Sequence, residues 1–435
     1  MSRRLALLAC ALWAAGMVLA EPLQLAGFGL AALLALVLLA RREVSVAAPL
    51  RNVAWAGLAW VGWGALTPVL ARWTLATPAW PRGSRYAQVL EPLGALALPV
   101  LDVLALPLAG LSAALAAGWA ASFALAVFQH YVRFPFDFPA AWHIPAERVR
   151  ENFAPVGAPP RYGAGGLLFH RLRFAHAGIA LLGPALAAAS ARVAPLARAG
   201  ALAVAVMVPT GAYLGFTRAA LGASLVITAL GTLLLASGWV RRGALALVVL
   251  VPLAALSSEG WRRRGAQAAA NVVDGERRLA MTAGARMFAA HPVAGVGFGN
   301  HKFHAEQMAD ELHMPRHILA DAHNVWLTVA AETGFVGVVL LALFHGLLAR
   351  ALWRGHRCGA WLASGALLSL VGYHVLGLVH YLPFHTSVSL SFQFAWGMGL
   401  AAAVRAEHPS SSAAGAGAEA EPSGRRRGVA DISSQ

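Results

Sequence analysis

The chain has 435 residues, of which 59% are hydrophobic and only 12% charged, whereas a soluble domain carries about 25% charged residues. Apolar runs that could cross about 30 Å of hydrocarbon recur from end to end, so the composition excludes a soluble enzyme and predicts an all-α polytopic membrane protein. The net charge of +15 would suggest nucleic acid in a soluble protein. Here the arginines lie mostly between apolar runs, where membrane orientation and anionic lipid or substrate head groups explain them, so we expect no nucleic-acid partner.

In chain order, about twelve apolar segments are long enough to form transmembrane helices. We expect them near residues 5–20, 22–40, 52–70, 91–108, 110–129, 173–191, 199–216, 219–240, 243–259, 324–348, 358–379 and 386–404. The predicted organisation is therefore nine transmembrane helices over residues 1–259, a large loop containing short helices over 260–323, three transmembrane helices over 324–404, and a disordered tail over 405–435.

The placement of arginine predicts the orientation of these helices. If the N-terminus is cytoplasmic, the short connections on that side carry arginines, as the positive-inside rule requires: Arg41, Arg42, Arg51, Arg192, Arg198, Arg241, Arg242, Arg350, Arg354 and Arg357. The longer loops then lie on the opposite side, because long loops are translocated largely regardless of their charge. For a bacterial chain, this predicts the inner membrane, with loop 260–323 in the periplasm and membrane lipids as neighbours.

Two arginine positions are candidates for binding phosphate. Arg218 stands alone in a very short turn between two apolar runs, and Arg277 and Arg278 precede a helical stretch that ends at Phe288. Guanidinium groups suit the oxygens of a phosphate, which they can bind in a bidentate manner. The alternative interpretations are interfacial snorkelling for Arg218 and a solvated basic face for the pair.

A histidine at the end of the loop is the candidate general base. His323 and Asn324 directly precede the apolar run that begins at Val325. A neutral imidazole can accept a proton near pH 7, although a helix cap or an interface group is the other interpretation. Glu332 follows nine residues later, about 13 Å deeper along the same helix, where an ionisable group should face the protein interior and find a partner.

The loop also contains glycines and histidines that have to be weighed. Gly295, Gly297 and Gly299 permit a tight turn or a close approach to a ligand, but no strand precedes them as a dinucleotide site would require. Two histidine pairs at helical spacing raise the possibility of a metal site: His301 with His304, and His313 with His317. Because the chain lacks a His-Glu-x-x-His pattern and a contributing cysteine, surface histidines are the favoured interpretation, and we expect neither a metal nor a cofactor.

Together these motifs resemble the O-antigen ligase and polymerase superfamily of bacterial envelope glycosyltransferases. The resemblance spans residues ~160 to 350. It rests on His291-Pro292-x-x-Gly295-Val296-Gly297-x-Gly299-Asn300, Ala322-His323-Asn324-x-x-Leu327 and Ala331-Glu332-x-Gly334-x-x-Gly337. The turn Thr217-Arg218-Ala219, Arg277 or Arg278, and the stretch Gly166-Leu167-Leu168-Phe169-His170 are also similar to the family pattern.

The resemblance implies a twelve-span fold and the transfer of a glycan from undecaprenyl pyrophosphate to an acceptor hydroxyl, with inversion and without a metal. By position, Arg218 and either Arg277 or Arg278 would hold the pyrophosphate, and His323 would assist the attacking hydroxyl. Asn324, Glu332 and the three glycines would support the site.

The leading prediction for the acceptor is the lipid A core, which would make the chain an O-antigen ligase. A growing glycan as acceptor, which would make the chain a polymerase, and protein O-glycosylation are the alternatives. A transporter or flippase of the same lipid-linked glycan is the competing class, but the polar residues concentrate in one loop, not along several helices.

Overall fold

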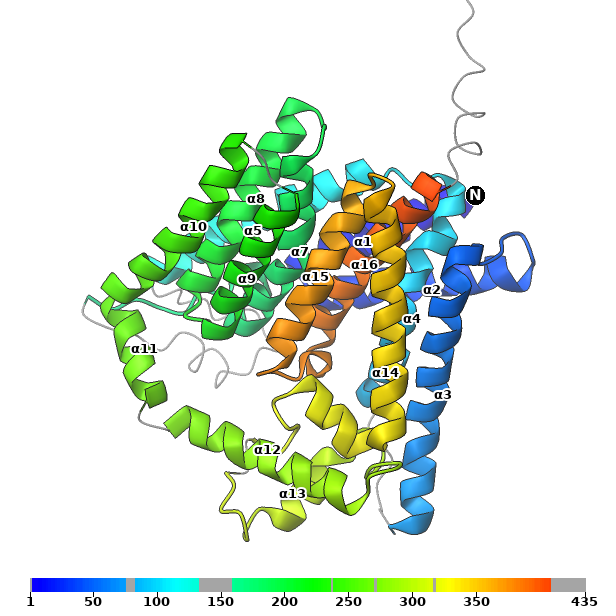
Figure 1. Ribbon diagram of the computed structural model, residues 1–435, viewed down its shortest axis with the longest axis vertical. Helices are drawn as coiled ribbons and strands as arrows, with labels where there is room; N and C mark the ends of the chain where they lie inside the picture. Colours follow the sequence, from blue (N-terminus) through cyan, green and yellow to red (C-terminus); the bar gives the residue numbers. More distant parts are fainter. Residues whose placement is uncertain are drawn as a thin grey trace, which may run out of the picture.

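The computed structural model describes residues 2–75, 83–132, 159–235, 238–269, 272–315 and 318–407. Within these ranges the chain forms helices joined by turns, which confirms the predicted all-α membrane class (Figure 1). Among the described residues, eight helices are long and apolar enough to cross a membrane, and three further apolar helices are shorter.

Every segment that the sequence predicts to span the membrane coincides with a helix. The first group consists of α1 (Ser2–Leu19), α2 (Glu21–Ala40), α3 (Arg51–Thr74), α4 (Gly83–Leu101) and α5 (Leu108–Tyr131). The second consists of α7 (Arg171–Ser190), α8 (Pro195–Leu214), α9 (Arg218–Leu234) and α10 (Gly238–Ser257). The last consists of α14 (Val325–Arg357), α15 (Trp361–Gly377) and α16 (Thr386–Glu407).

The centre of the bundle is formed by α7 and α16. Of their apolar spans, 78% and 89% of the residues are buried, compared with 17% for the peripheral α10. Helix α7 packs against α8, α9, α15 and α16, and α16 packs in addition against α4. The helix α16 runs on through Arg405, which pairs with Asp102 beside α4, and thus ends within the stretch predicted as a tail; residues 408–435 lie outside the described residues.

Three helices form the connection between α10 and α14 and lie across one end of the bundle (Figure 1). They are α11 (Glu259–Ala269), α12 (Val272–Ala290) and α13 (His301–Met308), so the predicted loop does contain short helices. We call this end of the bundle the loop end. The N-terminus and the end of α16 lie at the opposite end, which we call the termini end (Figure 1).

Helix α14 is not the single straight span that the sequence predicts for residues 324–348. It is broken at Gly334, whose φ of 66° and ψ of −169° are not helical. The rings of Trp326 and His345 are 6.2 Å apart, whereas an unbroken helix would separate these residues by about 28 Å. The part before Gly334 therefore folds back on the part after it. As a result Glu332 lies at the loop end and not deeper in the bundle, which corrects the depth expected from a continuous helix.

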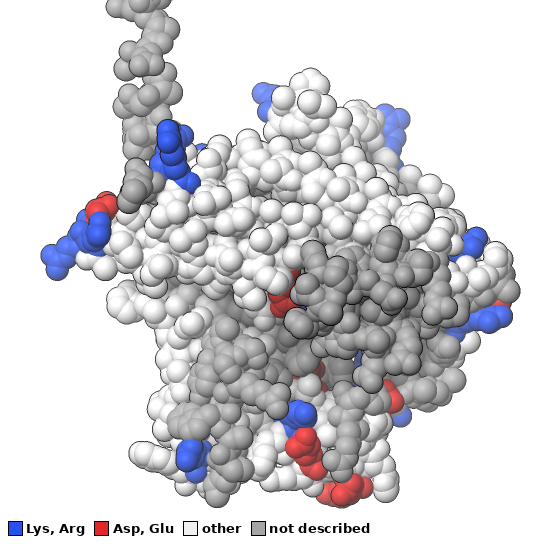
Figure 2. Space-filling model, turned by 180° about the vertical axis from the view of Figure 1, so that it is seen from behind, with Lys and Arg blue, Asp and Glu red and all other residues white. Residues whose placement is uncertain are grey.

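The charges are distributed as a membrane protein requires. Figure 2 shows a broad uncharged band between Lys and Arg side chains at the termini end and mixed charges at the loop end. The α2–α3 and α14–α15 connections and the start of α8, which carry arginines, lie at the termini end (Figure 1).

Candidate functional site

The glycine motif of the loop, residues 291–300, packs into the break of α14. The backbone N–H of Val296 donates to the Ala331 carbonyl over 2.9 Å, and that of Phe335 donates to the Pro292 carbonyl over 2.7 Å. Gly295 has a φ of +67°, and a Cβ atom there would overlap the backbone at Glu332 and Thr333. The break at Gly334 thus exists because the loop backbone occupies the space in front of it.

The remaining supporting residues hold the same loop against α3 and α13. The Phe298 N–H donates to Oγ1 of Thr67 in α3 over 3.1 Å, and a Cβ at Gly297 would meet the α3 backbone. Glu332 is 1% exposed, and its Oε1 accepts the N–H of His301 at the start of α13 over 3.3 Å. Glu332 is therefore buried and partnered as the sequence predicted, and Gly295 and Gly297 approach neighbouring helices, not an open ligand space.

The backbone around His323 is held by a left-handed turn and by hydrogen bonds to neighbouring residues. Its own backbone is left-handed, with a φ of +51°. Its N–H donates to Oδ1 of Asp321 over 2.7 Å. The next residue, Asn324, caps α14 by accepting the Leu327 N–H over 2.9 Å and donates to the carbonyl of Leu378 at the end of α15 over 3.0 Å. The backbone of His323 is consequently fixed between the start of α14 and the end of α15.

Asp321 is a site residue that the sequence analysis missed. Its Oδ1 lies 3.9 Å from Nδ1 of His323. The His323 side chain keeps 31% of its surface exposed while that of Asp321 keeps 8%, so only the imidazole can meet an incoming hydroxyl. A carboxylate beside a histidine can orient the ring. The available signal was an acidic residue two positions before the histidine.

The structure distinguishes the two adjacent arginines of α12. Arg278 is exposed, whereas Arg277 is half-buried and interacts electrostatically with His176 and His380. Arg277 is thus the member of the pair that faces the bundle, and it is the better candidate for holding phosphate.

His380 connects the candidate residues. It lies between α15 and α16 and interacts electrostatically with His176, Arg277, His323 and His385. Burial, and then these neighbours, lower the pKa of the His380 imidazole well below 6.5. The ring centroids of His176 and His380 are 4.7 Å apart. His176 comes from α7 and His380 from the connection between α15 and α16. Their spacing in the sequence therefore gives no sign that their rings lie close together.

Arg218 lies at the same end of the bundle. It is the half-buried first residue of α9, directly after the turn from α8. Trp261 of α11 stacks on Tyr213 with a centroid distance of 5.7 Å and donates to the Tyr213 carbonyl over 3.2 Å. This contact fixes the loop helices over the turn that carries Arg218. The three predicted groups therefore share the loop end, and Arg277 and His323 both act electrostatically on His380.

A metal site gains no support from the described residues. In these ranges no group of three His, Cys, Asp or Glu side chains is arranged to hold a metal ion. His301 is fully buried, with Nδ1 3.2 Å from the Leu319 carbonyl, and His304 is half-buried. His317, a member of the second pair, lies outside the described residues.

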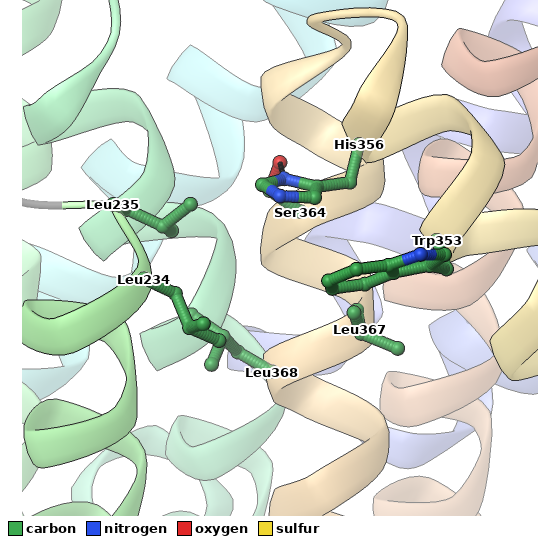
Figure 3. A pocket seen from close by; sticks show the side chains of 7 residues that line it. All are labelled: Leu234, Leu235, Trp353, His356, Ser364, Leu367 and Leu368. Carbon is green, nitrogen blue, oxygen red and sulfur yellow. Dashed lines mark hydrogen bonds between the residues drawn. The ribbon is translucent and has the colours of Figure 1, made fainter.

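A small pocket lies away from this site, near the termini end (Figure 3). Its lining is mostly apolar and consists of Leu234, Leu235, Trp353, His356, Ser364, Leu367 and Leu368. The only polar pair is His356 and Ser364, whose Nδ1 and Oγ are 2.8 Å apart. The lining lacks an arginine or lysine that could bind a diphosphate.

The segment that matches a known protein family contains the candidate residues of the loop-end site. Residues 201–342 match the family model described as O-antigen ligase, and this region contains Arg218, Arg277 and His323. No curated protein matches the chain. The family match supports a glycosyltransferase of the O-antigen ligase or polymerase type, which acts on lipid-linked glycans in general. The chain is thus a helical membrane protein whose residues 201–342, which include the candidate site, are similar to the O-antigen ligase family.

Proposed function

We propose that the protein is an inverting, metal-independent glycosyltransferase that moves a glycan from undecaprenyl pyrophosphate to a hydroxyl of the lipid A core. The observation that supports this proposal is that Arg277 and His323, which we assign as phosphate ligand and base, both act electrostatically on His380 at the loop end. Both residues lie within the stretch that matches the O-antigen ligase family.

The leaving group explains the need for arginines. As the bond between the anomeric carbon and the diphosphate oxygen breaks, negative charge develops on the diphosphate. Arg277 and Arg218 at the loop end would neutralise that charge, because guanidinium groups form charge-assisted hydrogen bonds to phosphate. Fixed arginines then supply the stabilisation that a divalent cation supplies in other glycosyltransferases.

The acceptor hydroxyl needs a base, and His323 has the required position. The hydroxyl oxygen attacks the anomeric carbon from the side opposite the diphosphate and transfers its proton to the imidazole. Attack from that side inverts the anomeric configuration. Asp321, within 3.9 Å of the ring, would orient the imidazole and stabilise the imidazolium that forms.

The position of the site at the end of a helical bundle suits a lipid-linked donor. The polyprenyl chain can remain in the hydrocarbon while the diphosphate and sugars reach the layer formed by α11, α12 and α13. We place the protein in the inner membrane of a bacterium with the loop end in the periplasm, because the short arginine-bearing connections lie at the opposite end.

The deciding experiment offers the purified protein a defined undecaprenyl-pyrophosphate-linked glycan, in the presence of a chelator, with lipid A core and a second lipid-linked donor as rival acceptors. Glycan attached to the core, with an inverted anomeric configuration by NMR, supports the proposal. Elongation of the second donor would instead identify a polymerase. Movement of the lipid-linked glycan across liposomes without a new glycosidic bond would show a transporter and overturn the proposal.

A further inference from the structure

An unsatisfied histidine lies at the inner side of the candidate site. His176, near the start of α7, is 1% exposed. Among the described residues neither of its ring nitrogens has a hydrogen-bond partner. A buried imidazole carries at least one N–H donor, and leaving that donor without an acceptor is costly. The environment of His176 therefore indicates a missing acceptor.

The groups around His176 indicate the charge of that acceptor. His380 faces it at 4.7 Å between ring centroids, with the rings tilted by 58°. In the described part of the chain, the groups that act electrostatically on the two rings are Arg277, His323 and His385. All are cations or imidazoles.

Two carboxylates that contact this region are already engaged. Glu21 pairs with Arg173, which lies on α7 three residues before His176, and Asp321 accepts the N–H of His323 and lies beside its ring. A group of imidazoles beside an arginine, with an unused donor, is suited to an anion.

We propose that the pair formed by His176 and His380 is a further subsite for the diphosphate of the lipid-linked donor, and that it takes up one proton when the diphosphate binds. This inference rests on the proposed function and adds a second set of diphosphate ligands beside Arg277. The two imidazoles, from α7 and from the α15–α16 connection, would donate hydrogen bonds to the diphosphate and take up a proton, which the permanently charged arginines do not do.

The proton uptake follows from the change in electrostatics on binding. Without a ligand, burial and the cationic neighbours hold the pKa of His380 low, so the ring is neutral near pH 7. A diphosphate reverses the sign of the local field and stabilises an imidazolium that donates to a phosphate oxygen. The proton comes from solvent on binding and returns to solvent when undecaprenyl pyrophosphate leaves.

Calorimetry on the full-length protein in detergent micelles tests this inference. Undecaprenyl pyrophosphate is titrated into the protein at several pH values in two buffers with different ionisation heats, so that the difference reports proton uptake. We expect an uptake of about one proton near pH 7, and an affinity that rises by up to about tenfold for each unit by which the pH falls between 8 and 6.5.

Two variants and a control identify the source of the proton. His176→Asn and His380→Gln should each weaken binding about tenfold and abolish the uptake, because an amide can donate a hydrogen bond but does not titrate here. His356→Gln, at the termini end, should leave both quantities unchanged. If His176→Asn does not fold, the His380→Gln variant, at a half-buried residue of the α15–α16 connection, still tests the inference.

The outcomes separate this inference from the proposed function. If Arg277→Ala abolishes binding while both histidine variants keep the affinity and proton uptake of the wild type, the histidine subsite is wrong and the proposed function stands. If the wild-type protein does not bind undecaprenyl pyrophosphate, or if Arg277→Ala binds it equally well, both are wrong.

Discussion

The guanidinium group of Arg277 lies close enough to His380 for its charge to contribute to the lowered pKa of that imidazole. Arg278, the next residue of α12, is exposed. Successive side chains of an α-helix point about 100° apart, so only one of two adjacent arginines can face the bundle. The choice between Arg277 and Arg278, which the sequence left open, is therefore made by the way α12 lies on the loop end.

The adjacent arginines provide a matched pair of variants. We expect Arg277→Ala to lower the turnover of glycan transfer by about 100-fold or more, because it removes a charge that stabilises the leaving diphosphate. Arg278→Ala should change turnover less than about twofold. Equal losses for the two variants, measured with the purified proteins on a defined lipid-linked donor, would contradict the assignment of this role to Arg277 and not to Arg278.

Arg218→Lys tests whether the shape of the cation matters in the turn before α9. A lysine keeps the charge but replaces a planar, bidentate donor by a point charge. We expect a loss in kcat/KM of about tenfold, with the protein amount in the membrane unchanged. Full activity for the lysine variant would indicate that Arg218 serves only to anchor the turn at the membrane interface.

His323 and Asp321 should behave as a base and its positioning residue. His323→Ala is expected to lower kcat by about 10² to 10⁴, the usual contribution of general base catalysis, while membrane insertion is preserved. Asp321→Asn should lower kcat by a smaller factor, because the ring loses the carboxylate that orients it and that stabilises the imidazolium formed during the reaction. Partial recovery in Asp321→Glu and full activity in Arg278→Ala are the controls; a kcat for Asp321→Asn equal to that of the wild type contradicts the assignment.

The contact between the loop and the break in α14 predicts a large effect on stability. Gly295→Ala places a side chain on a left-handed residue, at about 1–2 kcal/mol, and against the backbone of Glu332, which adds a steric cost. Its melting temperature in detergent should fall by several degrees. Gly346→Ala, on the same helix α14 with open space around it, should be neutral or slightly stabilising. Equal melting temperatures for Gly295→Ala and the wild type would refute the contact.

The lowered pKa values of histidines at the loop end predict how stability depends on pH. Burial lowers the pKa of His380, and burial together with His291 lowers that of His304. The unfolded chain, with a pKa near 6.5, therefore binds protons that the folded protein does not. Stability should be full above pH 6.5 and should decline as the pH falls below it. Melting curves between pH 8 and 5 measure this decline, which His380→Gln should reduce and His356→Gln should not.

The sequence alone determined the all-α membrane class of the protein, the approximate positions of its helices and the motifs that resemble the O-antigen ligase family. Hydrophobic run length predicts membrane helices reliably, because each span must bury its backbone polar groups in hydrocarbon. The matching family region, residues 201–342, contains Arg218, Arg277 and His323 in the predicted order. These features depend on local composition and on short motifs, which the sequence contains directly.

The tertiary structure decided what depends on contacts between distant segments. Gly334 belongs to a sequence motif within an apolar run, but its sequence context does not show that α14 breaks there. The loop backbone packs against Gly334, and the break leaves Glu332 at the loop end. In the same way His176 and His380 share no local pattern, and α7 and the α15–α16 connection bring their rings together. Local periodicity reports which face of a helix is apolar, but it does not report which helix will lie against that face.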